Sequence, residues 1–137
     1  MNATNLLLPA ALKARVEALM DLPLESTEDL AAEVTRHARV MEIVSKKRPV
    51  ALPMALALSH GLRLLLDEVK PDQDDENRKL IQAACRYFIE SEDGDHDLAS
   101  ESGLDDDAEV FVAVTRAVHR LELSDPVTAM LREKRKS

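Results

Sequence analysis

The segment between Pro53 and Val69 is apolar at helical spacing around most of its circumference, and this feature restricts the fold more than any other. A helix this apolar has to be covered by neighbouring helices on several sides. The run at residues 50–66 is short for a membrane span and contains His60 and Arg63, so we expect a core helix. Its stripe consists of Met54, Leu58, Leu62, Leu65, Leu66 and Val69, widened by Leu52, Leu56 and Leu64.

Apolar residues also repeat at helical spacing in five other segments, and no segment has the pattern of a strand. Glycine (3) and proline (6) are scarce, which disfavours a many-turned β sandwich or barrel. The 137 residues suit one compact domain. We therefore predict an all-α fold, a single-domain bundle of five to six helices over residues 1–137, with a frayed basic tail at 132–137. The other helices are expected at about residues 9–20, 27–46, 74–89, 106–121 and 126 onward.

Local signals mark several positions within these helices. Pro9 suits a first helical position, and Ser26 has capping-box spacing to Asp29. Gly61 in mid-helix costs about 1 kcal/mol relative to alanine, so we expect a close helix neighbour or a bend there. At the last helix, Ser124 or Asp125 is the expected cap.

The cysteine and histidines favour structural roles. Cys85 has no CxxC companion and lies on an apolar helix face, so we expect a small buried side chain. His37 and His60 lie on or near apolar faces and are expected to be core or interhelix histidines. His119 is expected to end its helix, where a cation is favoured. No two histidines have the spacing of a zinc pair.

Charge is distributed unevenly along the chain. The net charge is −8, which opposes non-specific binding to nucleic acid and to anionic membranes. Residues 87–111 contain ten Asp or Glu and no Lys or Arg, whereas the remaining residues contain 18 basic and 16 acidic side chains. The start of the chain does not have the pattern of a signal peptide, and the single cysteine is compatible with a reducing compartment. We expect a cytoplasmic protein.

About half of the acids in the acidic segment, residues 87–111, have a local explanation. Asp105 has the position of an N-cap for the helix expected at 106–121, and Asp106, Asp107 and Glu109 lie in its first turn. Free N–H groups and the helix dipole favour negative charge there. The same field repels cations, so we assign these four residues to helix capping.

The other acids lie at the opposite kind of helix end. Glu90 and Glu92 follow a helix C-terminus, where carbonyl groups already point outward and acids are unfavourable. Asp93, Asp95 and Asp97 follow at once, and like charges so close repel one another. A basic protein partner would compensate for this repulsion. We therefore predict a non-enzymatic interaction or regulatory module that presents these five residues to such a partner, with no cofactor and no catalytic residues.

Three alternatives remain open. A divalent cation could bind Asp93, Asp95 and Asp97 together with His96 or Glu101, in an enzyme or a sensor. The EF-hand pattern fails, because placing Gly94 sixth in the loop puts Ile89 first and Ser100 twelfth. The chain could instead form a structural homodimer through a spare apolar face of the helix at 53–69, with the acidic segment a solvated loop that only maintains solubility, or its basic tail could contact the acidic segment.

A short motif in this region resembles a known family. Arg86-Tyr87-Phe88, Asp97-Leu98 and the run from Gly103 to Val110 are similar to the YkvA-like family of small bacterial proteins, over residues 84–118. That family has an aromatic-ended helix, an aspartate-containing loop and a Gly-x-x-Asp-Asp-Ala segment that opens another helix. The resemblance implies a helical bacterial protein and carries no catalytic roles. Here the loop lacks proline and is more acidic. The matching residues are Tyr87, Asp97, Gly103, Asp105, Asp106 and Ala108.

Overall fold

The computed structural model describes residues 6–46, 52–69, 75–90 and 104–136, with residues 134–136 described by their backbone alone. These residues form six α-helices and one 3₁₀ helix, and they contain no strand. The predicted all-α class is therefore confirmed. The helices are α1 (Ala10–Met20), α2 (Thr27–Val44), α3 (Leu52–Asp67), α4 (Asp75–Glu90), α6 (Asp105–Ala117) and α7 (Asp125–Lys136), with the 3₁₀ helix η3 (Leu121–Ser124) between the last two.

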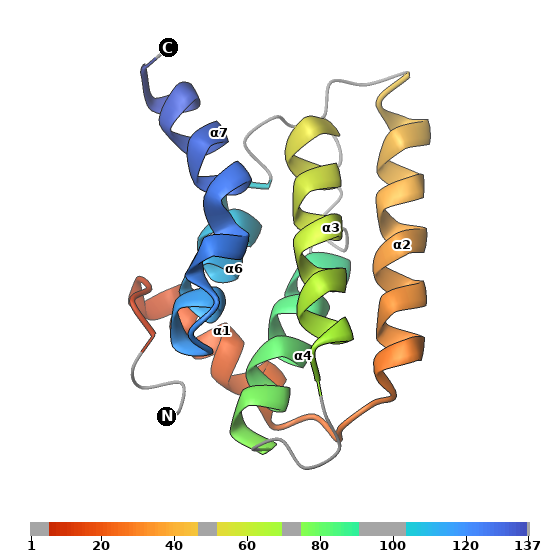
Figure 1. The fold of residues 1–137 in the computed structure, drawn as a ribbon, viewed down its shortest axis with the longest axis vertical. Helices are drawn as coiled ribbons and strands as arrows, with labels where there is room; N and C mark the ends of the chain where they lie inside the picture. Colours follow the sequence, from red (N-terminus) through yellow and green to blue (C-terminus); the bar gives the residue numbers. More distant parts are fainter. Residues whose placement is uncertain (1–5, 47–51, 70–74, 91–103, 137) are drawn as a thin grey trace.

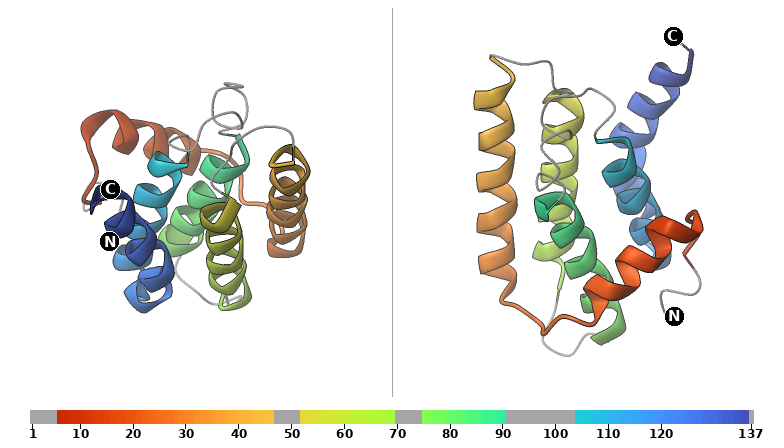
Figure 2. Two further views of the ribbon diagram at one scale, coloured as in Figure 1. Left: turned by 90° about the horizontal axis from the view of Figure 1, so that it is seen from above. Right: turned by 180° about the vertical axis from the view of Figure 1, so that it is seen from behind.

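Five of the helices run up and down the long axis of the molecule, and α1 crosses them obliquely (Figure 1). Helix α2 lies at one side, packed mainly against α3 and also against α4. Helix α7 lies at the other side, against α6 and α3. The view from behind shows α1 crossing α4 near the lower end of the bundle (Figure 2). Helices α3, α4 and α6 thus occupy the middle.

One hydrophobic core receives side chains from every helix, as the apolar periodicity predicts. Helix α3 buries one face in it, and α4 and α6 bury aromatic rings there. Because the chain has so few aromatic residues, aliphatic side chains fill most of this core. Among its largest fully buried members are Phe88, Phe111, Leu30, Met41, Leu58, Leu62, Leu65 and Leu80.

A neighbouring helix, α6, lies close to α3 at Gly61. This confirms the expectation of a close helix neighbour at this residue. A methyl group added at its Cα would overlap ring atom Cζ of Phe111 and would lie 3.0 Å from Cε1 and 3.1 Å from Cε2. Phe111 is itself buried, at 1% exposure. The glycine therefore makes room for an aromatic ring from α6 in the middle of the bundle.

The start of α2 agrees with its sequence signal. The side-chain oxygen of Ser26 accepts hydrogen bonds from the backbone N–H of Glu28 (3.1 Å) and Asp29 (3.3 Å). These bonds satisfy two of the N–H groups that a helix start leaves without partners. Pro9 was predicted to be the first helical residue. It occupies the N-cap position of α1 instead, and Ala10 is the first helical residue.

Helix α6 ends earlier than predicted, at Ala117 rather than near residue 121. His119 adopts a left-handed conformation, with φ 64°. The N–H of Arg120 donates to the carbonyl of Thr115 (2.7 Å), and the N–H of His119 donates to that of Arg116 (3.2 Å). This pair of bonds is a Schellman motif, which usually has glycine where His119 stands. The predicted helix end was wrong because the left-handed residue that ends the helix is a histidine, whereas the usual sequence signal for such an end is glycine.

At the other end of the chain, α7 remains helical through Lys136. The fraying predicted for residues 132–137 is therefore not seen up to that residue. Asp125 is the first residue of α7, and Ser124 belongs to η3, where its hydroxyl donates to the carbonyl of Leu121 (2.7 Å). Ser124 thus closes the preceding turn.

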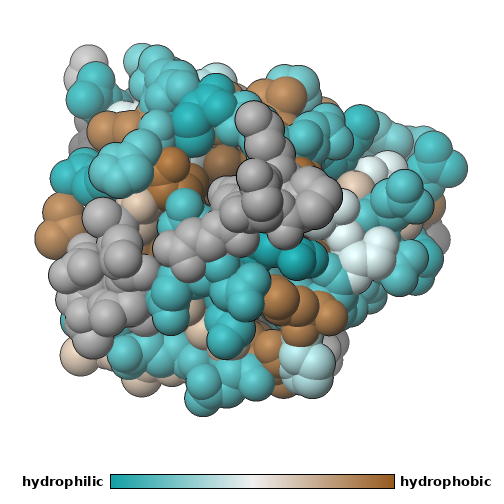
Figure 3. All heavy atoms as spheres, turned by 60° about the horizontal axis from the view of Figure 1, so that its bottom comes forward, coloured by the Kyte–Doolittle hydropathy of each residue, from teal (hydrophilic) through white to brown (hydrophobic). Residues whose placement is uncertain are grey.

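The outer face of α3 is mixed rather than apolar. The neighbouring helices cover most of α3, and the exposed positions are Pro53, Leu56, His60, Arg63 and Asp67. Among the residues that the structure describes, α3 thus offers no continuous apolar face for a homodimer. Viewed from its lower end, the molecule shows hydrophobic residues in small patches separated by hydrophilic ones (Figure 3).

The large apolar side chains that remain exposed are Leu7, Leu22, Leu24, Ile43, Leu56 and Leu121. Within the described ranges, none of the helices combines the length and the hydropathy that crossing a membrane requires.

Candidate functional site

The acidic segment connects two helices that pack against each other. Helix α4 ends at Glu90 and α6 begins at Asp105, and the two helices run antiparallel, so both ends of the connection lie at the same end of the helix pair (Figure 2). Of the predicted partner-binding residues, the structure describes Glu90, which is half-buried. The predicted residues Glu92, Asp93, Asp95, His96, Asp97 and Glu101 lie outside the described residues.

The four acids assigned to helix capping lie at the start of α6, but Asp105 does not have its predicted N-cap role. Leu104 occupies the N-cap position, and its carbonyl accepts a hydrogen bond from the N–H of Ala108 (2.9 Å). Asp105 is therefore already helical, and the prediction that it caps the helix was wrong. The buried Leu104 side chain anchors the helix entry in the core instead.

The first turn of α6 still has the negative charge that the helix dipole favours. Asp105, Asp106 and Asp107 all lie in it, and Glu109 follows in the next. Asp106 is exposed, whereas Asp107 is buried, with 3% exposure. The position of Asp107 in the first turn agrees with the prediction, whereas its burial was not predicted from the sequence.

Two buried aromatic residues lie near the end of α4, where the acidic segment begins. Phe88 is buried in the core, and its ring meets that of His37 edge to face, with the centroids 4.7 Å apart. Tyr87 is also buried, and the guanidinium of Arg15 lies over its ring, 5.6 Å from the centroid. Such contacts between a cation and an aromatic face are attractive. The acidic segment therefore leaves from a fixed helix end.

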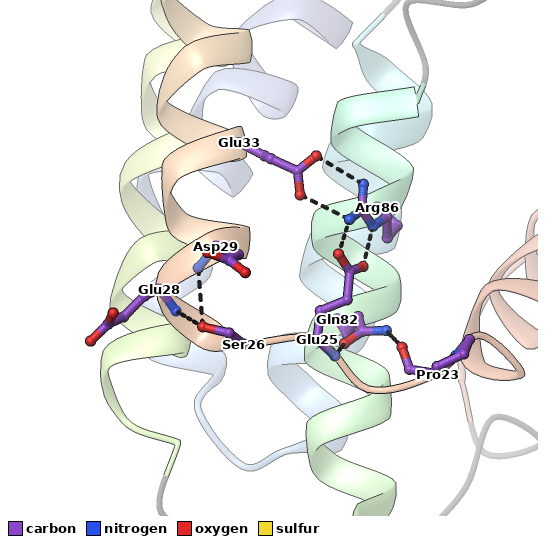
Figure 4. Close-up of polar contacts among 8 residues, drawn as sticks. All are labelled: Pro23, Glu25, Ser26, Glu28, Asp29, Glu33, Gln82 and Arg86. Atoms are coloured by element: carbon purple, nitrogen blue, oxygen red, sulfur yellow. Dashed lines mark hydrogen bonds and ion pairs between the residues drawn. The ribbon is translucent and has the colours of Figure 1, made fainter.

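Sequence reasoning missed a polar cluster around Arg86, which lies one turn before the end of α4 (Figure 4). The guanidinium of Arg86 meets two carboxylates (Figure 4). Its Nε donates to Glu25 Oε2 (2.6 Å), and its Nη2 donates to the other oxygen of the same carboxylate. Its Nη1 and Nη2 also donate to Glu33, at 3.3 and 2.8 Å. The hydrogen bonds that Arg86 donates to the Glu25 carboxylate, foremost, raise the pKa of Arg86 above its ordinary value.

Gln82, one turn before Arg86, fastens the backbone between α1 and α2. Its Oε1 accepts from the N–H of Glu25 (2.8 Å), and its Nε2 donates to the carbonyl of Pro23 (2.8 Å). Gln82 is buried, and a buried amide that makes both kinds of bond fixes a loop firmly. Together Gln82 and Arg86 join the α1–α2 connection and α2 to α4. We read this cluster as structural, because each of its bonds ties one chain segment to another.

The buried cysteine and histidine do not form a nucleophilic site. Cys85 is fully buried, and desolvation raises the pKa of its thiol to about 12. A thiol with such a pKa stays protonated at neutral pH and is a poor nucleophile. His37 is buried as predicted, whereas His60 is exposed, so the prediction of a core histidine was wrong there.

The predicted cation ligands all lie outside the described residues. Within the described ranges, no group of three or more His, Cys, Asp or Glu side chains could hold a metal ion. Two pairs of carboxylates share an arginine and are therefore occupied: Glu25 and Glu33 bind Arg86, and Glu68 and Glu122 bind Arg120.

No protein-family model, no curated protein and no solved structure matches this chain. The resemblance to the YkvA-like family therefore stays a prediction. Of its matching residues, Tyr87 is buried in the last turn of α4, while Asp105, Asp106 and Ala108 lie at the start of α6.

Proposed function

We propose that this protein is a non-enzymatic interaction module whose acidic segment binds a basic protein partner. The observation that supports this proposal is the concentration of charge: ten acids and no Lys or Arg lie within residues 87–111 of a chain that is otherwise nearly neutral. Two packed helices hold the ends of this segment. A docking surface needs such a fixed base, because ordering a free chain on binding costs conformational entropy.

Within the described residues, the ion pairs of Arg86 and Arg120 are made with carboxylates outside the acidic segment, those of Glu25, Glu33, Glu68 and Glu122. Complementary charge on a partner would offset the repulsion among the acids of the segment and would steer association. The proposed contact residues are Glu90, Glu92, Asp93, Asp95 and Asp97.

A calorimetric titration with a defined basic peptide, decalysine, tests this function. We expect a variant with these five residues changed to Gln or Asn to bind the peptide at least tenfold more weakly than the unchanged protein. The affinity of the unchanged protein should also fall as salt is added, because salt screens exposed charges.

The matched control removes five acids elsewhere: Glu17, Asp21, Glu28, Glu42 and Asp67, all of which are exposed. Both variants have the same net charge, so a general loss of attraction would affect them equally. The proposal requires the control to retain its affinity within about threefold. Equal weakening in both variants would show that net charge alone, and not the acidic segment, attracts the peptide.

A further inference from the structure

A groove of about 320 Å³ lies between α6, α7 and the residues just before α1. On α6 it is lined by Val112 and Ala113, and on α7 by Leu131. Leu7 and Leu8 close it from the N-terminal side. This volume is at the lower end of the range for small-molecule sites. Three separate parts of the chain therefore contribute apolar side chains to the groove.

Leu7 is the most exposed of the large apolar side chains, at 68%. It lines the groove, so a ligand with an apolar body would cover it. Removing apolar surface from water is favourable by about 25 cal/mol per Å². The groove thus offers apolar surface that the folded chain itself does not bury.

Two arginines, Arg116 on α6 and Arg132 on α7, line the same groove. Both are exposed, and neither makes an ion pair or a side-chain hydrogen bond with any residue that the structure describes. Arg86 and Arg120, by contrast, each hold two carboxylates. The guanidinium groups of Arg116 and Arg132 are therefore available to an anionic ligand in the groove.

The charges that line the groove are distributed unevenly, because Glu109 lines it as well as the two arginines. Arg116 is two helical turns from Glu109 on the same face of α6, a rise of about 10 Å. An anionic group would therefore be drawn toward Arg116 and repelled from Glu109. Arginine donors bind oxyanions through paired hydrogen bonds, which favours a carboxylate or a phosphate as the head group.

We propose that this groove binds a small amphipathic anion, with an oxyanion head group held by Arg116 and Arg132 and an apolar body against Val112, Leu131 and Leu7. The site does not depend on the proposed docking role of the acidic segment. None of the five proposed partner-contact residues lines the groove, so either proposal can fail alone.

Four probes at constant ionic strength test the site by calorimetry: octanoate, octyl phosphate, octanol and inorganic phosphate, each below the concentration at which micelles form. We expect at least one of the two amphipathic anions to bind with a Kd below about 1 mM. Octanol and inorganic phosphate should bind at least tenfold more weakly. Binding of octanoate alone would identify a carboxylate ligand, and binding of octyl phosphate alone would identify a phosphate ligand.

The double variant Arg116→Gln, Arg132→Gln should weaken the binding of the amphipathic anion at least tenfold. The matched control Arg36→Gln, Arg39→Gln changes two exposed arginines on α2, which packs against α3 and α4 on the opposite side of the molecule. It should alter the Kd by less than twofold.

Methyl NMR signals locate the apolar body independently of these variants. The largest shifts on adding the anion should belong to Val112, Leu131 and Leu7. The proposal is overturned if neither amphipathic anion binds, if octanol binds equally well, if the two double variants lose affinity equally, or if the methyl shifts lie elsewhere.

Discussion

Gly61 is a residue at which local propensity and packing make opposite demands. Alanine is the better helix former by about 1 kcal/mol, but its methyl group would overlap the buried ring of Phe111. Overpacking of this kind costs about 1–3 kcal/mol. We therefore expect Gly61→Ala to lower the free energy of unfolding, as measured by urea denaturation, although it improves helix propensity.

A second substitution separates packing from backbone effects at this position. Phe111→Leu shortens the side chain that faces Gly61, so Gly61→Ala should cost less in that background than in the unchanged protein. An equal cost in both backgrounds would mean that the ring does not cause the destabilisation.

Cys85 makes the folded protein sensitive to alkaline pH. Burial raises the pKa of its thiol to about 12, from about 9 when exposed. Above pH 9 the unfolded chain releases this proton while the folded protein keeps it, so stability falls as pH rises toward 12. Between these two pKa values, the free energy of unfolding falls by at most about 1.4 kcal/mol per pH unit. Urea denaturation at several pH values should show a shallower decline for Cys85→Ala than for the unchanged protein. Parallel declines would refute this assignment.

Single residues also show where sequence reasoning failed. His60 and Leu56 share a face of α3 that looked apolar in sequence, yet both are exposed. On a helix that is apolar nearly all round, the pattern does not determine which side remains uncovered. Asp107 was assigned to the first turn of its helix from its charge, which did not reveal that the packing of α6 buries it.

At the scale of helices, α2 offers a test of what an N-cap contributes. The Ser26 hydroxyl accepts from two backbone N–H groups that have no partner within the helix. Ser26→Ala should therefore cost about 1 kcal/mol of stability. Ser45 lies at the other end of the same helix, and its hydroxyl donates an exposed hydrogen bond to the carbonyl of Glu42. Ser45→Ala should cost less than half as much in thermal or urea denaturation, and equal costs would contradict the capping account.

Arg86 joins α4 to α2 and to the segment before it through two carboxylates. Arg86→Met would leave Glu25 and Glu33 facing each other, and we expect a loss of about 2 kcal/mol, reduced from fully buried values because both carboxylates are partly exposed. Arg86→Lys keeps the charge but not the paired hydrogen bonds, so it should recover part of this loss. The exposed control Arg36→Met should change the urea midpoint little. An equally small effect of Arg86→Met would show that the cluster does not stabilise the bundle.

The helices themselves could be predicted from apolar spacing, but the connections between them could not. Arg86 lies 61 residues from Glu25 and 53 from Glu33 along the chain, so no local pattern links them. Gln82 is likewise 59 residues from Pro23. The early end of α6 was missed for a different reason, because a histidine in a left-handed conformation has no reliable sequence signal.

At the scale of the whole molecule, the sequence and the structure agree on an all-α fold. The sequence places an excess of acids between residues 87 and 111, and the structure places the two flanking helices side by side in the bundle. This region and the arginine-lined groove meet at Glu109, which belongs to both. The charge distribution was readable from sequence alone, whereas the groove was not, because its walls come from residues 7–9, 109–116 and 128–132.

The central claim is that the acidic segment is where a basic partner binds. An NMR titration of the ¹⁵N-labelled protein with decalysine at constant pH tests this claim most directly. The account predicts that the largest amide shifts fall within residues 87–111 and that they vanish in the variant with Glu90, Glu92, Asp93, Asp95 and Asp97 neutralised. Shifts of equal size over all acidic surfaces, or shifts that persist in that variant, would contradict it.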